Sequence, residues 1–218
     1  YTTLFRSIGG IYALLSYGSW GLIPIYWKLL STSSALEILA HRMLWSMVFV
    51  FGLLAVQKRL IEILELLKSS KIIWLLLCTA SLLGCNWFVY IYAVNTDQVI
   101  EASLGYYINP LLNVLMGFIF LRERLNFLQC IALGLATLGV LNFLWDFGSL
   151  PWIALSLSFT FSIYGLLRKV IPVKPLVGLL IESVLFAPLA IIMISFWMMD
   201  GSGSFGKHWG TDFLLIGA

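Results

Sequence analysis

The sequence predicts an all-α protein, a polytopic bundle of membrane-spanning helices. Of its 218 residues, 61% are hydrophobic and only 11% are charged, whereas soluble domains average about 45–50% and about 25%. The apolar residues form long continuous runs, each about as long as the 20 residues that a helix needs to cross the hydrocarbon core of a bilayer. A transmembrane β-barrel would instead show short segments of alternating hydrophobicity.

Seven apolar runs follow one another and an eighth begins near residue 211. The seven runs cover residues 8–30, 35–56, 72–94, 101–121, 127–145, 149–167 and 175–199. We therefore expect seven membrane-spanning helices and part of an eighth. Because the chain starts without Met and stops inside an apolar run, we expect both ends to be truncated.

The basic residues predict how these helices are oriented. Ten Lys and Arg residues fall in the N-terminal tail and in every second connection, namely Arg6, Lys58, Arg59, Lys68, Lys71, Arg122, Arg124, Arg168, Lys169 and Lys174. The other connections carry only Lys28 and Lys207. Since cytoplasmic loops are enriched in Lys and Arg, the N-terminus is predicted to be cytoplasmic. The segment 58–71 has apolar residues at helical spacing and is expected to lie on that surface as a short amphipathic helix.

The run 101–121 contains more polar groups than a simple anchor requires. Glu101 stands at its start, and Asn109 and Asn113 lie four residues apart on the face that also holds Tyr106. Pro110 removes a backbone hydrogen bond in mid-helix and is expected to kink it. The cluster fits a substrate pathway. The alternative is that the Asn side chains join helices by hydrogen bonds.

The run 35–56 opens with three ionisable residues. Glu37 and His41 are four residues apart and share a face, while Arg42 points about 100° away. Ionisable groups inside a membrane usually face a cavity or pair with one another. One interpretation is a substrate or proton site at the outer mouth. The other is that Glu37 caps the helix and pairs with Arg42 or His41.

Two further positions are candidates for the same pathway. Glu182 lies about 10 Å from the cytoplasmic end of its helix, at about 1.5 Å per residue, and has no cation nearby in that helix. It is therefore expected to be protonated or to have a partner on another helix. Asn86 and Tyr90 share a face beside Trp87, which fits either an interfacial aromatic belt or the lining of a cavity.

Several prolines and the three cysteines also lie within or next to the apolar runs. Pro24, Pro110 and Pro188 lie inside apolar runs and are candidate hinges, with close helix packing as the alternative for the first. Residues 148–151, Gly-Ser-Leu-Pro, predict a helix cap with Pro in the first turn. The three cysteines have no metal-binding spacing and are expected to be small buried side chains; they are Cys78, Cys85 and Cys130.

The chain also contains a weak internal repeat. Residues 20–45 align without a gap on residues 161–186, which places His41 opposite Glu182. Because five helices precede the second copy, it would run through the membrane in the inverted orientation. Inverted repeats are common in secondary transporters, with the site near the midplane. In this scheme His41 and Glu182 would belong to paired outer and inner gates.

Several segments resemble a known family. WGLIPIYWK (20–28), EILAHRMLWS (37–46) and EASLGYYINPLLNVLMGFIFLRERL (101–125) are similar to the RarD family of the EamA-type drug/metabolite transporter superfamily. The resemblance implies ten helices in two inverted five-helix repeats in the cytoplasmic membrane of a bacterium. Residues 1–147 would form the first repeat (helices 1–5), and residues 148–218 a truncated second repeat (helices 6–8). It supplies no substrate and no catalytic residues.

The function predicted from these features is transport of small metabolites or drugs, as a secondary-active exporter that works by alternating access. The candidate pathway residues are Glu37, His41, Asn86, Tyr90, Glu101, Tyr106, Asn109, Asn113 and Glu182. His41 and Glu182 are the candidate proton-linked pair, with H+ as the coupling ion. The expected partners are a small-molecule substrate and membrane lipid, without nucleic acid, and a homodimer is left open.

Other classes of function are less well supported. The sequence contains no HExxH or GxSxG motif and no ATP-binding loop, so we expect no enzyme activity, no catalytic residue, no metal and no cofactor. A channel, a lipid flippase and a non-transporting membrane scaffold or sensor are the remaining alternatives. Prolines that break helices in mirrored positions favour a carrier over a rigid open pore.

Overall fold

The computed structural model of the chain describes residues 2–147 and 150–218. These stretches form helices and no strand. The helices are α1 (Thr2–Leu29), α2 (Ala35–Val56), α3 (Ile61–Leu66), α4 (Ser70–Asn95), α5 (Val99–Phe120), α6 (Phe127–Phe147), α7 (Trp152–Val170), α8 (Pro175–Asp200) and α9 (Trp209–Ile216). The prediction of an all-α bundle is confirmed.

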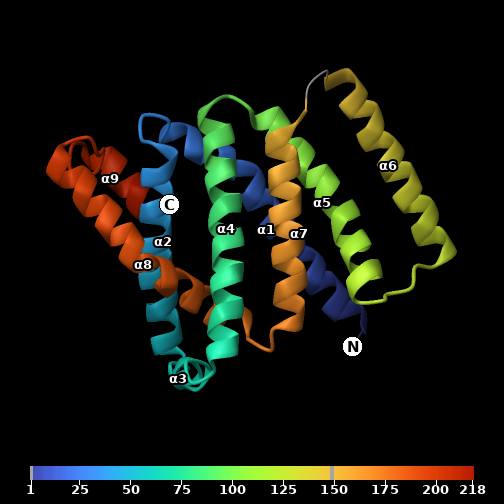
Figure 1. Cartoon of the computed structure of the whole chain (residues 1–218), viewed down its shortest axis with the longest axis horizontal. Helices are drawn as coiled ribbons and strands as arrows, with labels where there is room; N and C mark the ends of the chain where they lie inside the picture. Colours follow the sequence, from blue (N-terminus) through green and yellow to red (C-terminus); the bar gives the residue numbers. More distant parts are fainter. Residues whose placement is uncertain (1, 148–149) are drawn as a thin grey trace.

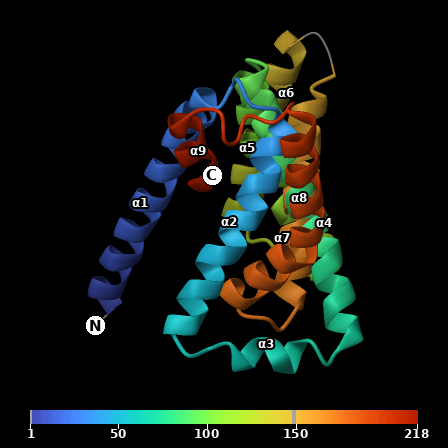
Figure 2. The same ribbon diagram turned by 90° about the vertical axis from the view of Figure 1, so that its left-hand side faces the viewer.

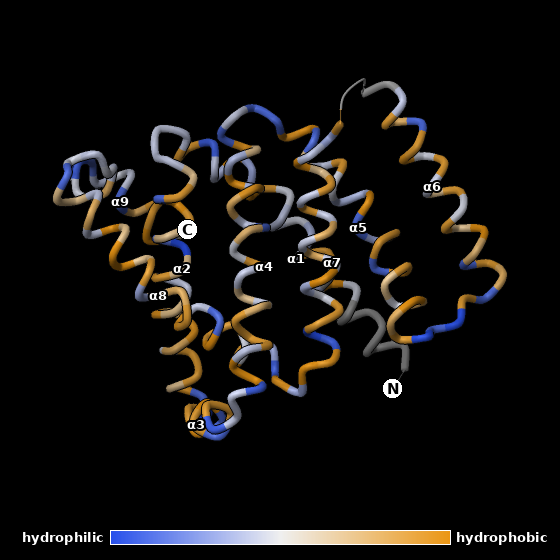
Figure 3. Tube along the Cα trace, viewed as in Figure 1, coloured by the Kyte–Doolittle hydropathy of each residue, from blue (hydrophilic) through white to orange (hydrophobic). Residues whose placement is uncertain are grey.

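Six of the described helices are long and apolar enough to cross a membrane, namely α2, α4, α5, α6, α7 and α8. Each coincides with a predicted run to within a few residues. The run 8–30 corresponds to α1, and the run that begins near residue 211 corresponds to α9. Hydrophobic residues cover the helices and hydrophilic residues gather at the connections (Figure 3). The chain is a multi-pass membrane protein.

Successive long helices alternate in direction (Figures 1 and 2). The short helix α3, the α5–α6 connection and the α7–α8 connection lie at one end of the bundle, where α1 also begins. These connections carry most of the basic residues of the chain, so we name this the basic end. The opposite end holds the α1–α2, α4–α5 and α8–α9 connections and is named the far end.

The core of the bundle is built from two helix pairs and α4. α7 packs most extensively on α5, α8 packs most extensively on α2, and α4 contacts α2, α7 and α8. Towards the far end the core contains Trp27, Ile38 and Ile91, and towards the basic end it contains Leu54 and Leu180. Helix α6 contacts α5 at the edge, and none of its residues with described side chains is buried.

Small residues allow α5 and α7 to approach closely. A Cβ atom on Gly105 would lie 3.0 Å from the carbonyl oxygen of Ala154 and 3.1 Å from the Cβ atom of Leu157. Contacts this short leave no room for a methyl group without movement of a helix backbone. Gly105 therefore sets the distance between the two helices.

Replacing Gly105 with Ala should destabilise the protein by about 1–3 kcal/mol, because the added methyl group overpacks the α5–α7 contact. Thermal unfolding of the protein in detergent measures the effect. Gly134→Ala is the matched control, since a Cβ atom at Gly134 on α6 meets nothing within 4 Å. Equal unfolding temperatures for the two variants would contradict this account of the contact.

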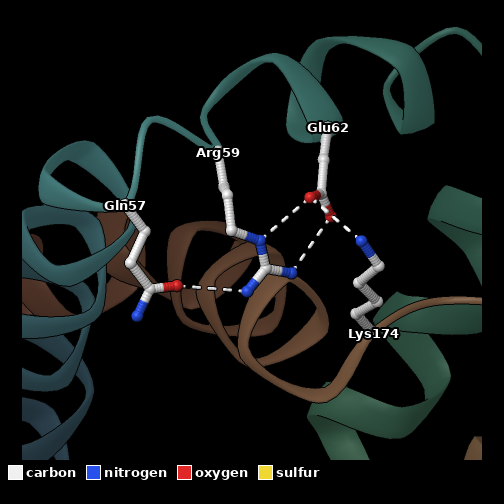
Figure 4. A network of polar contacts seen from close by, with 4 residues as sticks. All are labelled: Gln57, Arg59, Glu62 and Lys174. Atoms are coloured by element: carbon white, nitrogen blue, oxygen red, sulfur yellow. Dashed lines mark hydrogen bonds and ion pairs between the residues drawn. The ribbon is translucent and has the colours of Figure 1, made fainter.

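A polar network at the basic end joins α3 to the segment between α7 and α8 (Figure 4). The Arg59 guanidinium donates hydrogen bonds to both carboxylate oxygens of Glu62, at 2.9 and 3.1 Å, and a third to Gln57. Lys174 donates to Oε1 of Glu62 at 3.1 Å. The hydrogen bonds from Arg59 and Lys174 lower the pKa of Glu62 from its ordinary 4.5 to about 2.

The Glu62 network should therefore depend on pH. A carboxylate whose pKa is lower in the folded state stabilises the fold above its ordinary pKa and loses that effect as the pH falls through the folded value. The substitution Glu62→Gln should slightly lower the Tm at neutral pH, and the difference from the wild type should shrink between pH 4.5 and about 2. Exposed ion pairs contribute little, so a small shift is expected. Glu65→Gln, at an exposed position of the same helix, is the control, and a difference that persists unchanged to low pH would contradict the prediction.

Three sequence predictions need correction or fall outside the described residues. The cysteines are exposed on the helix surfaces, not buried. They are small enough to lie among apolar side chains that face lipid. Pro151 is the residue before the helix, which starts at Trp152, so Pro does not lie in the first turn. Gly148 and Ser149, and with them the proposed boundary between the repeats, lie outside the described residues.

Candidate functional site

Glu37 and His41 lie at the far end of α2 and hold the connection between α8 and α9. Ser34 caps α2 by accepting a hydrogen bond from the Glu37 backbone N–H. The Glu37 carboxylate accepts hydrogen bonds from the backbone N–H groups of Ser204 and Phe205, at 2.6 and 3.2 Å. The His41 ring lies against the ring of Phe205, with centroids 4.7 Å apart. Both side chains are buried.

The expected pairing of Glu37 with Arg42 or His41 is wrong for the side chains that the structure describes. The Glu37 carboxylate makes no ion pair with either residue and instead binds two backbone amides. Nδ1 of His41 accepts a hydrogen bond from Trp45, and its Nε2 has no hydrogen-bond partner in the described part. Because Nδ1 acts as the acceptor, the neutral ring carries its hydrogen on Nε2, and it is this N–H that has no partner.

Arg42 lies on the other side of α2, inside a group of aromatic rings. Its guanidinium carbon is 4.0 Å from the ring centroid of Trp87 and 5.3 Å from that of Trp27. Tyr90 and Tyr106 lie close enough to interact with it electrostatically. We call these five residues the Arg42 cage. Cation–π contacts of this kind stabilise a partly desolvated guanidinium.

The Arg42 cage encloses a small cavity between α1, α2, α4 and α5. Its wall is completed by Trp20, Ile23, Asn86 and Ile91. The free space holds about one water molecule. Asn86 donates hydrogen bonds to the Leu157 carbonyl and to Thr160, both at 2.9 Å, and so ties this wall to α7. Asn86 and Tyr90 therefore line a cavity, as one of the two sequence interpretations has it.

A larger cleft of about 380 Å³ lies beside the cavity. Trp20, Tyr90 and Tyr106 line both spaces, and the remaining lining residues of the cleft are Tyr17, Gly21, Pro24, Val99 and Ser103. The rings of Tyr90 and Tyr106 meet edge to face, with centroids 5.9 Å apart. Trp20, Tyr90 and Tyr106 therefore lie where the cavity and the cleft adjoin.

Glu182 occupies a second polar position, near the basic end. Its carboxylate accepts a hydrogen bond from Thr79 of α4 at 2.6 Å, and Nη1 of Arg168 from α7 lies 3.8 Å away. Arg168 reaches this position because it passes over Gly178, where a Cβ atom would collide with the guanidinium at 2.1 Å. The expectation of a partner from another helix fits these contacts. Oε2 of Glu182 has no hydrogen-bond partner among the described residues.

The remaining candidates in α5 join helices and do not line the cavity. The Glu101 carboxylate accepts a hydrogen bond from the backbone N–H of Ile153 at 2.8 Å, at the first turn of α7. A carboxylate is favourable there because helix N-termini carry unpaired N–H groups and partial positive charge. Asn109 accepts a hydrogen bond from Ser162 at 2.8 Å, and Asn113 faces Gly165 of α7. These contacts match the alternative in which polar groups hold helices together.

Comparison with known proteins identifies the family. The model of the EamA-like transporter family matches residues 7–145. The chain belongs to this family. It is 48% identical to "Protein RarD" of Salmonella typhimurium over 208 residues, which cover 95% of this chain and 69% of the relative. It is 42% identical to "Uncharacterized transporter YojE" of Bacillus subtilis, over 94% of this chain and 71% of the relative. No solved structure matches the chain.

As a RarD-type member of the EamA-like family, the chain is a membrane transporter. The names of its relatives specify neither substrate nor direction. No group of three metal-ligating side chains occurs in the part of the chain that the structure describes. The candidate hinges Pro24, Pro110 and Pro188 each lie within a continuous helix, and their role in movement stays a prediction.

Sequence reasoning missed the central residue of the cavity. Arg42 was set apart because it points away from Glu37 and His41, and that same angle directs it to α1 and α4. The available signal was the presence of three tryptophans, Trp20, Trp27 and Trp87. The sequence does not indicate that α1 and α4, which carry them, pack next to Arg42. Thr79 and Arg168 were missed as partners of Glu182 for the same reason.

Replacing Glu37 with Gln should loosen the α8–α9 connection, because a neutral amide oxygen accepts a weaker hydrogen bond than a carboxylate. Hydrogen exchange of the Ser204 and Phe205 amides should accelerate by about tenfold. Asp212→Asn is the matched control, since Asp212 of α9 accepts from the backbone N–H of Gly206 in the same connection. Unchanged exchange at 204 and 205 in the Glu37→Gln protein would show that the carboxylate does not hold this segment.

Proposed function

We propose that the protein is a secondary-active exporter of small molecules that works by alternating access. The observation that carries the proposal is a series of polar groups that lie inside an otherwise apolar bundle, between its far end and its basic end. Glu37 and His41 lie at the far end, the Arg42 cage follows, and Glu182 lies towards the basic end with Thr79 and Arg168. Buried ionisable groups at membrane depth are costly and typically mark the path of a substrate or ion.

The basic end is assigned to the cytoplasm, in the cytoplasmic membrane of a bacterium. Three connections rich in Lys and Arg gather there, together with the start of α1. The positive-inside rule then gives a cytoplasmic N-terminus. The exposed apolar faces of the helices would contact lipid.

The direction of the helices supports an inverted repeat. By the alignment of residues 20–45 with 161–186, α1 corresponds to α7 and α2 corresponds to α8. In each pair the two helices run in opposite directions (Figure 1). The corresponding residues His41 and Glu182 each lie near the N-terminal end of their helix. Because α2 and α8 pack against each other in opposite directions, His41 lies towards the far end of the bundle and Glu182 towards the basic end. Movement of one pair against the other would open the bundle first at one end and then at the other.

We further propose H+ as the coupling ion, with His41 and Glu182 as the groups that take it. Each side chain is buried and has one polar atom without a hydrogen-bond partner in the described part of the chain. Glu37 and Asp212 lie near His41, and Arg168 lies near Glu182. A proton that arrives on either residue changes the balance of charge at one end only, which could bias the opening of that end.

The narrow interior favours a carrier over an open channel. The Arg42 cavity holds about one water molecule, so it is too small to serve as an open aqueous pore. A channel or lipid flippase, and a membrane scaffold or sensor, remain the alternatives that the experiment must exclude.

The test uses the full-length protein in a bacterial host that lacks its own copy. External metabolites and drug tolerance are compared for the wild type, Glu182→Gln, His41→Gln and the control Glu65→Gln at equal abundance in the membrane. The wild type and the control should export a compound in response to a pH gradient, and either pathway variant should slow export by at least about tenfold. Export by both pathway variants at the wild-type rate would exclude the proton-linked pair. Profiles identical to the empty host would argue against transport.

A further inference from the structure

The Arg42 cage contains a cation without an anionic partner. No carboxylate lies within ion-pair distance of Arg42 among the side chains that the structure describes, and its Nε is buried without a hydrogen-bond partner. Arg168, in the last turn of α7 at the basic end, does have a carboxylate nearby, on Glu182. Arg42 instead lies mainly among aromatic rings.

The carboxylates closest to it along α2 and α5 are already engaged. Glu37 accepts two backbone hydrogen bonds from the α8–α9 connection, and Glu101 accepts one from the first turn of α7. Neither can reach Arg42 without leaving amide groups unpaired. Arg42 is half-buried, with its Nε fully buried; a partly desolvated charge without a partner is unfavourable, and cation–π contacts offset only part of that cost.

The shape of the cage restricts what could complete it. The planar guanidinium has five N–H donors in a fixed fork that matches a carboxylate. Trp20, Trp27, Trp87, Tyr90 and Tyr106 surround the space next to it, and their rings offer flat apolar surfaces. A ligand that fits both features carries one carboxylate on a flat apolar body.

We propose that the Arg42 cage is the substrate site and that its substrates are small organic carboxylates with a flat, apolar body. The carboxylate takes the place of the missing anion on Arg42, and the apolar body stacks among the tryptophan and tyrosine rings. The adjoining cleft of about 380 Å³ supplies the space that the closed cavity lacks, once the Tyr90 and Tyr106 side chains that line both spaces turn. This inference rests on the proposed transport function for its meaning, but binding can be measured without transport.

The tryptophans of the cage make a direct binding assay available. The purified full-length protein is titrated in detergent with benzoate, benzamide and benzylamine, which differ in charge on the same ring, and the tryptophan fluorescence is followed. Benzoate should change the fluorescence saturably, and the neutral and cationic compounds should not. Equal responses to all three compounds would overturn the proposal, because they would show apolar partition alone.

Arg42→Gln should weaken benzoate binding by about 30-fold or more, as expected when one partner of a buried charge pair is removed. Arg42→Lys keeps the charge but loses the bidentate fork and should bind with intermediate affinity. Arg124→Gln, the same chemical change at an exposed position, should bind as the wild type does. Equal benzoate affinity for the wild type and a folded Arg42→Gln protein would refute the site. If Arg42→Gln does not fold, Arg42→Lys and the ligand series carry the test.

Transport measurements separate this inference from the proposed function. In proteoliposomes, benzoate-dependent fluorescence without benzoate flux would leave the anion site standing and count against the transporter proposal. Saturable flux of a neutral or cationic compound that is unaffected by Arg42→Gln would leave the transporter standing and refute the anion site. Flux of benzoate that is lost in Arg42→Gln supports both.

Discussion

The structure depends on one constraint, the need to give every polar group inside a hydrocarbon layer a partner from the protein. The bundle meets it with contacts between helices. Asn86 binds the α7 backbone, Glu101 binds the first turn of α7, and Thr79 binds Glu182. Helix α7 is thus held by polar contacts from α4 and α5 as well as by the close approach at Gly105. In the described part of the chain, the constraint is not met at single buried atoms of six residues, namely Ser33, His41, Arg42, Asn95, Arg168 and Glu182.

The sequence predicted the helices well because their signal is local. Runs of about 20 apolar residues bounded by Lys, Arg, Gly and Pro indicate where the long helices begin and end, and α2 coincides with its predicted range of 35–56. Six of the seven predicted crossings qualify as spans among the described helices. The burial of a single small residue is a different matter. Cys78, Cys85 and Cys130 are apolar enough for either a core or a lipid-facing surface, so composition alone could not place them.

The candidate site was predicted only in part, because partners come from helices far apart in sequence. Glu182 stood out as a carboxylate without a neighbour, but nothing in its own helix indicates Thr79 or Arg168. Asn109 and Asn113 are polar residues inside a membrane helix, which is compatible with either a substrate pathway or a contact between helices. Only the position of Ser162 on α7, which donates to Asn109, distinguishes these two interpretations. Arg42 is recognisable in the sequence as an ionisable residue inside an apolar run. The rings of Trp27 and Trp87 that contact it come from α1 and α4, and the sequence does not indicate this contact.

The succession of His41 and Arg42 on one helix has a mechanical consequence. The two side chains leave α2 about 100° apart, one towards Phe205 and the other towards Trp87. Because a helix turns as a stiff rod, any rotation of α2 about its axis displaces both side chains by the same angle. If His41 takes a proton and Arg42 binds a ligand, as proposed above, then both events act on the orientation of the same helix, and an ion gradient could drive the bound molecule through that helix.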